Sequence, residues 1–332
     1  MLSSFILSLI VYPYGFFDND SLRYTVSETM EGKNTKPILV LIVFLAVISA
    51  AAWFIKTHDI AVLNPSGTIG SKERRLIIES TLLMLIVVIP VYVATFTIAW
   101  RYREGNSKAK YSPELDHSRK LEFIWWIIPT IIITILGVIT YKSSHELDPA
   151  KSISSAPVLK IQVVALQWKW LFIYPQQNVA TVNYAILPVN KQVDFQITSD
   201  APMNSFWIPK LGGQIYAMSG MATQVYLIAD TSGSYRGLSA NISGAGFSNM
   251  NFVVNATPQD NFNKWIKYIK TLSRPLSPQA YATLSQPNDN LTLAFYSYAP
   301  GNLFDKIIQK YNYTKHAVPG SDNYIASRGG LL

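Results

Sequence analysis

The chain has 332 residues, of which 49% are hydrophobic and 14% are charged, and its formal net charge is +8. A mean hydropathy of +0.17 is too high for an ordinary water-soluble protein of this size, and predicts a membrane protein with a large aqueous part. No basic run with interleaved aromatic residues occurs, which argues against nucleic acid as a partner. The absence of cysteine excludes disulfides, thiol catalysis and cysteine-based metal sites.

An apolar segment, residues 38–55, follows Met30, Lys33 and Lys36 and contains a run of small residues at 49–52. A short basic region, an apolar region and small residues in this order are typical of a secretory signal. We therefore expect residues 1–57 to be a signal peptide, with translation starting at Met30 and residues 1–29 not translated. An uncleaved membrane helix is an equal alternative, since a stretch of this length can cross the hydrocarbon core.

Two further uncharged segments, residues 80–100 and 123–141, predict a transmembrane hairpin within residues 76–142. Each is long enough to cross about 30 Å of hydrocarbon at about 1.5 Å per residue. Neither has the polar face that a core helix of a soluble protein shows. Pro90 and Pro129 lie inside them, and membrane helices tolerate such prolines where neighbours satisfy the freed carbonyl groups.

The loop between the two segments fixes the expected orientation. Residues 101–122 carry six basic side chains: Arg101, Arg103, Lys108, Lys110, Arg119 and Lys120. Short basic loops remain in the cytoplasm. We expect a multi-pass protein of a bacterial inner membrane whose C-terminal part faces the periplasm.

Residues 150–257 show the pattern of β structure, because Val193, Phe195 and Ile197 alternate with polar residues, as do Val225 and Leu227. Turn residues recur between such runs, which predicts a β-sandwich. From residue 258 the spacing becomes helical. Two apolar faces predict amphipathic helices packed on the sandwich or on a partner subunit: Phe262, Trp265, Ile266 and Ile269, then Leu303, Phe304, Ile307, Ile308 and Tyr311. We expect residues 258–332 to be a helical extension ending in a loose tail.

The stretch from residue 204 to residue 252 has the spacing of a loop that wraps an ion, with side chains at 239, 241, 243, 247 and 250 turned inward. The residue types do not suit copper or zinc, which prefer thiolate and imidazole. All four histidines lie outside residues 158–256. The stretch is a metal-site frame without metal ligands.

These residues, with Gln167-Trp168-Lys169-Trp170 and the run 214–221, resemble subunit II of the haem–copper terminal oxidases. In the cytochrome c oxidase branch of that family, a dicopper centre is held by His, a Cys-x-Glu-x-Cys loop, a second His and a Met. Those six positions fall at Asn204, Ser239, Asn241, Ser243, Phe247 and Met250, so only the Met is kept. This pattern resembles the cytochrome bo-type ubiquinol oxidase branch, which has lost the copper.

The resemblance implies a membrane-anchored α+β protein, with a two-helix transmembrane hairpin, a cupredoxin-like domain at 150–257 that lacks copper, and C-terminal helices. It also implies a complex that oxidises ubiquinol, reduces dioxygen to water and translocates protons. This chain would carry no cofactor, and the haems, copper and ubiquinol would lie in subunit I. Its partners would be subunit I and smaller membrane subunits.

Several single residues invite a role. Glu122 stands at the cytoplasmic end of the second segment, where the resemblance implies a proton entry and where a structural helix-end charge is an equal alternative. For Glu79 we favour the structural role. Trp168 and Trp170 match an electron entry in the family, but without copper we expect them to pack between sandwich and membrane surface. Asn241 lacks the charge with which the family's Glu helps to bind magnesium.

Two other functions remain as alternatives. A copper-bearing cytochrome c oxidase subunit is opposed by the missing Cys and His ligands. A non-enzymatic, membrane-anchored β-sandwich interaction protein would need neither the frame around Met250 nor Glu122 after a basic loop. Without the family, Asn204, Ser239 and their neighbours would be ordinary loop residues.

Overall fold

The computed structural model describes residues 35–103, 106, 108–109, 118–272, 274–288 and 293–316. It divides into two compact units, Met1–Asp59 and Ile60–Leu332. The described part of the first unit is helix α3 (Thr35–Thr57), and a helix here is compatible with a signal sequence and with a membrane span. The expected start at Met30 and the tail beyond residue 316 lie outside the described residues.

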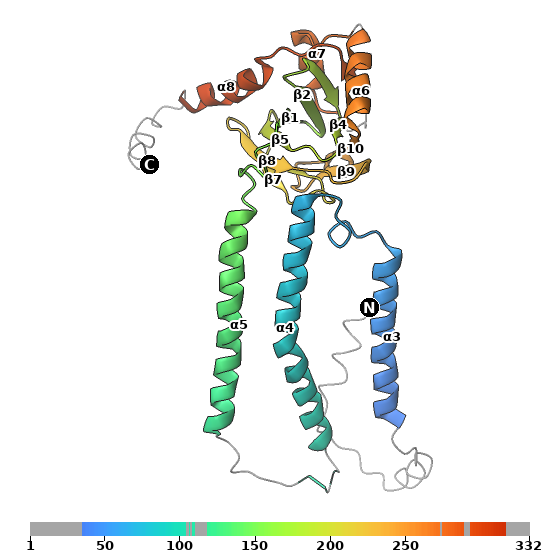
Figure 1. The fold of residues 1–332 in the computed structure, drawn as a ribbon, viewed down its shortest axis with the longest axis vertical. Helices are drawn as coiled ribbons and strands as arrows, with labels where there is room; N and C mark the ends of the chain where they lie inside the picture. Colours follow the sequence, from blue (N-terminus) through green and yellow to red (C-terminus); the bar gives the residue numbers. More distant parts are fainter. Residues whose placement is uncertain are drawn as a thin grey trace, which may run out of the picture. The chain divides into compact units, whose positions relative to one another are not determined.

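Helices α4 (Thr68–Arg101) and α5 (Arg119–Glu146) are long and apolar enough to cross a membrane (Figure 1). The predicted hairpin is confirmed, and Pro90 and Pro129 lie inside the two helices. Both helices extend beyond their uncharged segments. In particular, α4 already begins at Thr68, because its first turn is hydrogen-bonded to the sandwich.

Backbone contacts join the start of α4 to the sandwich. Gly67 forms a β-bridge with Ala229, and the Gly70 N–H donates to the Leu211 carbonyl at 3.0 Å. A Cβ at Gly67 would lie 2.6 Å from the carbonyl oxygen of Ile228, so only glycine allows this approach. The helix and the domain are therefore connected by main-chain hydrogen bonds as well as by the chain itself.

The sandwich has a six-stranded sheet in the order β11-β3-β2-β1-β5-β8 and a five-stranded sheet in the order β4-β10-β9-β6-β7. Neighbouring strands are antiparallel except for the parallel pairs β1–β5 and β4–β10. The strands of the first sheet are β1 (Leu159–Leu166), β2 (Lys169–Tyr174), β3 (Val179–Val182), β5 (Val193–Ser199), β8 (Thr223–Leu227) and β11 (Ala294–Tyr296). Those of the second are β4 (Tyr184–Pro188), β6 (Asn204–Trp207), β7 (Ile215–Ala217), β9 (Gly233–Ser239) and β10 (Asn251–Thr257).

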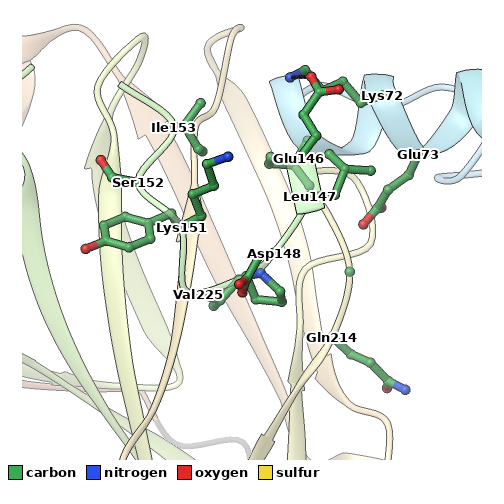
Figure 2. Close-up of a pocket in the computed structure, with 14 residues that line it drawn as sticks. Lys72, Glu73, Glu146, Leu147, Asp148, Lys151, Ser152, Ile153, Gln214 and Val225 are labelled. Atoms are coloured by element: carbon green, nitrogen blue, oxygen red, sulfur yellow. Dashed lines mark hydrogen bonds and ion pairs between the residues drawn. The ribbon is translucent and has the colours of Figure 1, made fainter. Parts of the chain in front are cut away.

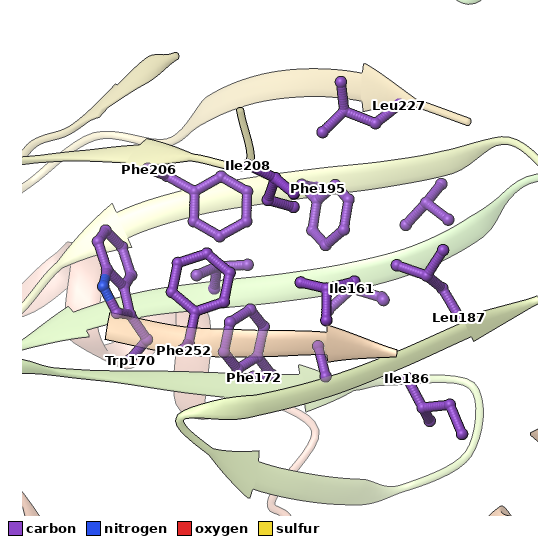
Figure 3. Close-up of a cluster of buried hydrophobic side chains, with 14 of the residues drawn as sticks. Ile161, Trp170, Phe172, Ile186, Leu187, Phe195, Phe206, Ile208, Leu227 and Phe252 are labelled. Atoms are coloured by element: carbon purple, nitrogen blue, oxygen red, sulfur yellow. The ribbon is translucent and has the colours of Figure 1, made fainter. Parts of the chain in front are cut away.

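An aromatic cluster fills one end of the space between the sheets (Figure 3). The rings of Phe206 and Phe252 stack with centroids 5.1 Å apart. Trp170 meets both rings edge-on, at 5.5 Å and 5.7 Å. All three side chains are at most 1% exposed. Aromatic pairs stabilise a fold by more than the burial of their surface area alone. This cluster is therefore a principal packing contact between the two sheets.

A third layer covers the other face of the six-stranded sheet. Buried residues of this face contact α7 (Pro278–Leu284) and α8 (Leu303–His316), and Phe304 and Ile307 of α8 are each 3% exposed. Helix α6 (Gln259–Thr271) packs on the main core through Phe262, Ile266 and Ile269. The predicted C-terminal helices thus pack on the sandwich, while α7 and β11 between them were not foreseen.

One buried carboxylate holds α7 and α8 to the sandwich. Asp200 follows β5, and its side chain is 1% exposed. It accepts hydrogen bonds from the hydroxyls of Tyr281 (2.6 Å) and Tyr311 (2.8 Å), and it pairs with Lys310 Nζ at 2.7 Å. Burial and the bond to Asp200 raise the pKa of the Tyr281 hydroxyl, and the bond to Asp200 raises the pKa of Lys310.

We expect Gly237→Ala to destabilise the sandwich, because a Cβ there would lie 2.1 Å from the ring of Phe252. Overpacking of this kind costs about 1–3 kcal/mol. Gly301→Ala is the control: nothing lies within 4 Å of its Cβ, and we expect a change within about 0.5 kcal/mol. Urea unfolding of the full chain in detergent measures both. Equal stabilities of the two variants would contradict this account of the core.

We also expect the docking of α8 to weaken at alkaline pH. The ordinary pKa values are 10.0 for Tyr281 and 10.5 for Lys310, and both are raised in the fold. The unfolded chain therefore loses these protons first, so stability is constant below about pH 10 and falls as the pH rises above it. Hydrogen exchange of α8 measures the effect. Asp200→Asn should flatten the pH dependence and lower protection at neutral pH; an unchanged alkaline slope in that variant would refute the assignment.

Candidate functional site

Three of the six positions in the metal-site frame meet at the ends of three strands. Asn204 begins β6, Ser239 ends β9, and Met250 directly precedes β10. The Ser239 hydroxyl donates to Asn204 Oδ1 at 2.9 Å, and the Ser239 N–H donates to the Met250 carbonyl at 3.1 Å. All three residues are at most 3% exposed. A hydrogen bond between two neutral side chains thus joins the strands at this point.

Of the other three positions, Asn241 also contacts Ser239, whose hydroxyl lies 3.3 Å from the Asn241 carbonyl. The Asn241 carboxamide donates to the Met203 carbonyl at 2.9 Å. Phe247 is half-buried at the start of a short 3₁₀ helix, Phe247–Asn249. The Ser243 hydroxyl is buried and has no hydrogen-bond partner among the described residues. Ser and Asn side chains of the frame therefore satisfy one another at Asn204 and Ser239, but not at Ser243.

The donor set of these residues does not fit copper. It offers carboxamide and hydroxyl oxygens and one thioether, whereas copper in proteins is held chiefly by imidazole and thiolate. Within the described ranges, no group of three or more His, Cys, Asp or Glu side chains could hold a metal ion.

Trp168 packs against the Ser243–Gly246 segment of the loop. It lies in the turn between β1 and β2 with φ of 61°, a conformation that costs a bulky residue free energy. Its indole N–H donates to the Ser243 carbonyl at 3.2 Å. A Cβ on Gly246 would lie 2.4 Å from the indole ring. The glycine therefore lets the loop rest on the ring, which positions the Ser243–Gly246 segment without an ion.

Trp170 behaves differently from the sequence expectation. It is 0% exposed in the aromatic cluster, so the prediction that it packs against the membrane surface is wrong. Trp168 and Trp170 have different surroundings because Trp168 belongs to the turn before β2 and Trp170 to the strand itself. The ring N–H of Trp170 is buried and has no hydrogen-bond partner in the described part of the chain.

Glu122 lies in the first turn of α5 and is exposed. A carboxylate in this position interacts favourably with the helix dipole, which is a sufficient structural reason for its presence. A proton-entry role and a structural role both agree with this placement. Glu79 accepts a hydrogen bond from Arg75 at 2.6 Å, one turn earlier on α4, as expected of a structural charge.

A cavity of about 250 Å³, lined by both charged and apolar side chains, lies where the start of α4 and the end of α5 meet the sandwich. Figure 2 shows Lys72 of α4 and Glu146 of α5 pointing toward each other, and their ion pair measures 2.5 Å. Glu73 lines the cavity beside Gly213. This cavity was not predicted from the sequence, although Lys72, Glu73 and Glu146 lie close to the ends of the apolar segments. The cavity and its ion pair couple the two helices to each other near the domain.

The hairpin and the sandwich define a membrane-anchored, cupredoxin-like protein. Three family models match the chain: "Cytochrome C oxidase subunit II, transmembrane domain" at residues 63–142, "Cytochrome C oxidase subunit II, periplasmic domain" at 171–257, and "COX Aromatic Rich Motif" at 270–315.

Three relatives indicate the branch of this family to which the chain belongs. The chain is 46% identical to cytochrome bo(3) ubiquinol oxidase subunit 2 of Pseudomonas putida, over 81% of this chain and 87% of the relative. It is 47% identical to the same subunit of Pseudomonas aeruginosa, over 77% of each chain. It is 48% identical to ubiquinol oxidase subunit 2 of Acetobacter aceti, over 76% and 83%. The chain belongs to the subunit II family of the haem–copper oxidases, in its ubiquinol oxidase branch.

We expect Ser239→Ala to destabilise the domain, because it leaves the buried Oδ1 of Asn204 without its donor. Loss of such a partner costs about 1–3 kcal/mol. Ser243→Ala removes a hydroxyl that has no hydrogen-bond partner among the described residues. The stability of this variant should therefore be unchanged or higher. Chemical denaturation compares the two variants. If Ser243→Ala is the more destabilised one, the Asn204–Ser239 contact does not hold the loop.

Proposed function

We propose that this chain is the non-redox subunit of a proton-translocating ubiquinol oxidase that reduces dioxygen to water. The observation that carries the proposal is the replacement of every thiolate and imidazole position of the loop by Asn204, Ser239, Ser243 and Phe247, with Asn204 and Ser239 hydrogen-bonded to each other. Electrons then reach the haems and copper of subunit I from ubiquinol bound by the rest of the complex. The relatives' printed names support ubiquinol as the donor.

In the proposed role, the hairpin anchors the periplasmic domain in the membrane, and this domain covers the outer face of subunit I. The start of α4 is hydrogen-bonded to the sandwich, and Lys72 and Glu146 join α4 to α5. A domain held in this way keeps its orientation relative to the membrane helices. Smaller membrane subunits complete the expected set of partners.

The proposed topology places the protein in a bacterial inner membrane. The hairpin at 76–142 crosses it twice, and the basic loop between its helices lies in the cytoplasm. The copper-free domain at 150–257 and the extension at 258–332 then lie in the periplasm. The segment 1–57 is either a cleaved signal peptide or an additional span.

The donor specificity of the intact complex tests the proposal. A complex purified through an affinity tag on this chain should carry haem, oxidise ubiquinol with dioxygen, and fail to oxidise reduced cytochrome c. The reason is that the loop has no ligand set for an electron-accepting dicopper centre. Rapid oxidation of cytochrome c by the complex would refute the proposal, and so would purification of the chain without a haem protein.

The second part of the proposal gives Glu122 a role in proton entry. Glu122→Gln keeps the size and hydrogen bonding of the side chain and removes its titratable proton. We expect an assembled complex with intact haem spectra and ubiquinol turnover lowered roughly tenfold, with partial recovery in Glu122→Asp. Glu79→Gln, which removes a carboxylate paired with Arg75, is the control and should turn over normally. If Glu122→Gln matches the parent across about pH 6 to 9, the carboxylate is only an interfacial anchor.

A further inference from the structure

A second pocket, of about 320 Å³, lies in the aromatic-rich extension, between the six-stranded sheet and α7. Two of its lining side chains are cationic, Lys169 of β2 and Arg274, which lies just before the β-bridge at Pro275. The other described lining residues are neutral, and none of them is a carboxylate. The pocket is distant in the sequence from both the frame around Ser239 and Glu122.

Lys169 is a buried cation held only by neutral groups in the described structure. Its exposure is 5%, and its ammonium donates to the carbonyls of Leu284 and Gln286, at 3.0 Å each. An ammonium has three N–H donors, so these two bonds leave one for a ligand. Burial lowers the pKa of Lys169, as expected where no anion offsets the loss of hydration.

Arg274 presents a second cation in a fixed position. Its guanidinium lies over the ring of Tyr296, 5.2 Å from the centroid, and the Arg274 carbonyl accepts the N–H of Ser297 at 3.0 Å. A cation over an aromatic ring is attracted by the ring's electrons, and the guanidinium carries five N–H groups that can donate to a ligand. Unlike Lys169, Arg274 is exposed, so a ligand can reach the pocket from solvent.

We propose that this pocket binds a phosphate group. Paired bonds from a guanidinium edge match the oxygens of a tetrahedral oxyanion, and a buried ammonium adds a charge-assisted bond to a third oxygen. An anion would also offset the cost of burying Lys169. Such a site would tie the aromatic-rich extension to β2, the strand that follows Trp168. The phosphate is that of a free anion or that of a phospholipid headgroup.

The test uses the full-length chain in a neutral detergent. In the first arm, orthophosphate is titrated into the chain and its binding is measured by calorimetry. In the second arm, the chain is mixed with vesicles of anionic phosphatidylglycerol or, separately, of net-neutral phosphatidylcholine. Saturable binding of orthophosphate at one site per chain supports the proposal. Binding to phosphatidylglycerol vesicles that orthophosphate displaces assigns the headgroup as the source. Absence of binding in both arms overturns the proposal.

Arg274→Gln is the decisive variant, because an exposed side chain can be changed without loss of the fold. We expect its affinity for orthophosphate to fall at least about tenfold, since one charge-assisted pair is lost. Arg236→Gln is the matched control: this arginine also lies on the surface, where it contacts Asn251 at 3.0 Å in the other sheet, and it should bind as the parent does. Equal affinities in the two variants overturn the site.

Asp289 follows Asn288 in the sequence and lies outside the described residues, so its carboxylate is a competing occupant. Asp289→Asn distinguishes the two cases. Under the proposal this variant binds orthophosphate as the parent does. If the parent binds none and Asp289→Asn binds stoichiometrically, the pocket is filled by the chain's own carboxylate and the proposal fails.

Discussion

The stack of Phe206 on Phe252 is the contact on which the organisation of this domain depends. Phe206 lies two residues after Asn204 on β6, and Phe252 lies two residues after Met250 on β10. The interplanar angle of 8° and the centroid distance of 5.1 Å show a close, parallel contact. Both ends of the metal-site frame are therefore fixed by the core, two residues away from the frame itself. The ring contact thus brings these strands together beside the frame.

This arrangement explains how the loop keeps its shape with neutral residues. The core sets the distance between β6, β9 and β10, and Gly237 on β9 leaves the space that the Phe252 ring occupies. The Asn204–Ser239 hydrogen bond then satisfies the polar groups that face each other at the strand ends. Trp168 holds the outer part of the loop through Ser243 and Gly246. Hydrogen bonds and ring packing thus hold the described parts of this loop.

The parts of the fold that could be predicted are those whose sequence pattern has a single physical explanation. Long uncharged segments have few alternatives to membrane helices, and α4 and α5 are where they were expected. The helical apolar spacing around Phe262 likewise predicted α6. Trp170 was misplaced because β2 is buried on both faces, so that no alternation of polar and apolar residues marks which side chain enters the core.

The contacts that the sequence did not reveal join residues that are far apart in the chain. Asp200 meets Tyr281 and Lys310, about 80 and 110 positions later, and a lone carboxylate after a strand carries no sign of such partners. Nothing in the run Gln167-Trp168-Lys169-Trp170 shows that the Lys169 ammonium reaches carbonyls at and just after the end of α7. Short elements such as α7 and β11 have too few residues to show a period.

The third layer has a consequence for how the domain is held. Without α7 and α8, the face of β1, β2 and β3 that carries Val164, Leu171 and Ala180 would be exposed to water, and these residues are 0% exposed in the structure. The extension is therefore an integral part of the fold, which Asp200 fixes by charge and hydrogen bonds. Since β2 begins directly after Trp168, the strand that the extension covers also leads out of the turn that contacts Ser243 and Gly246.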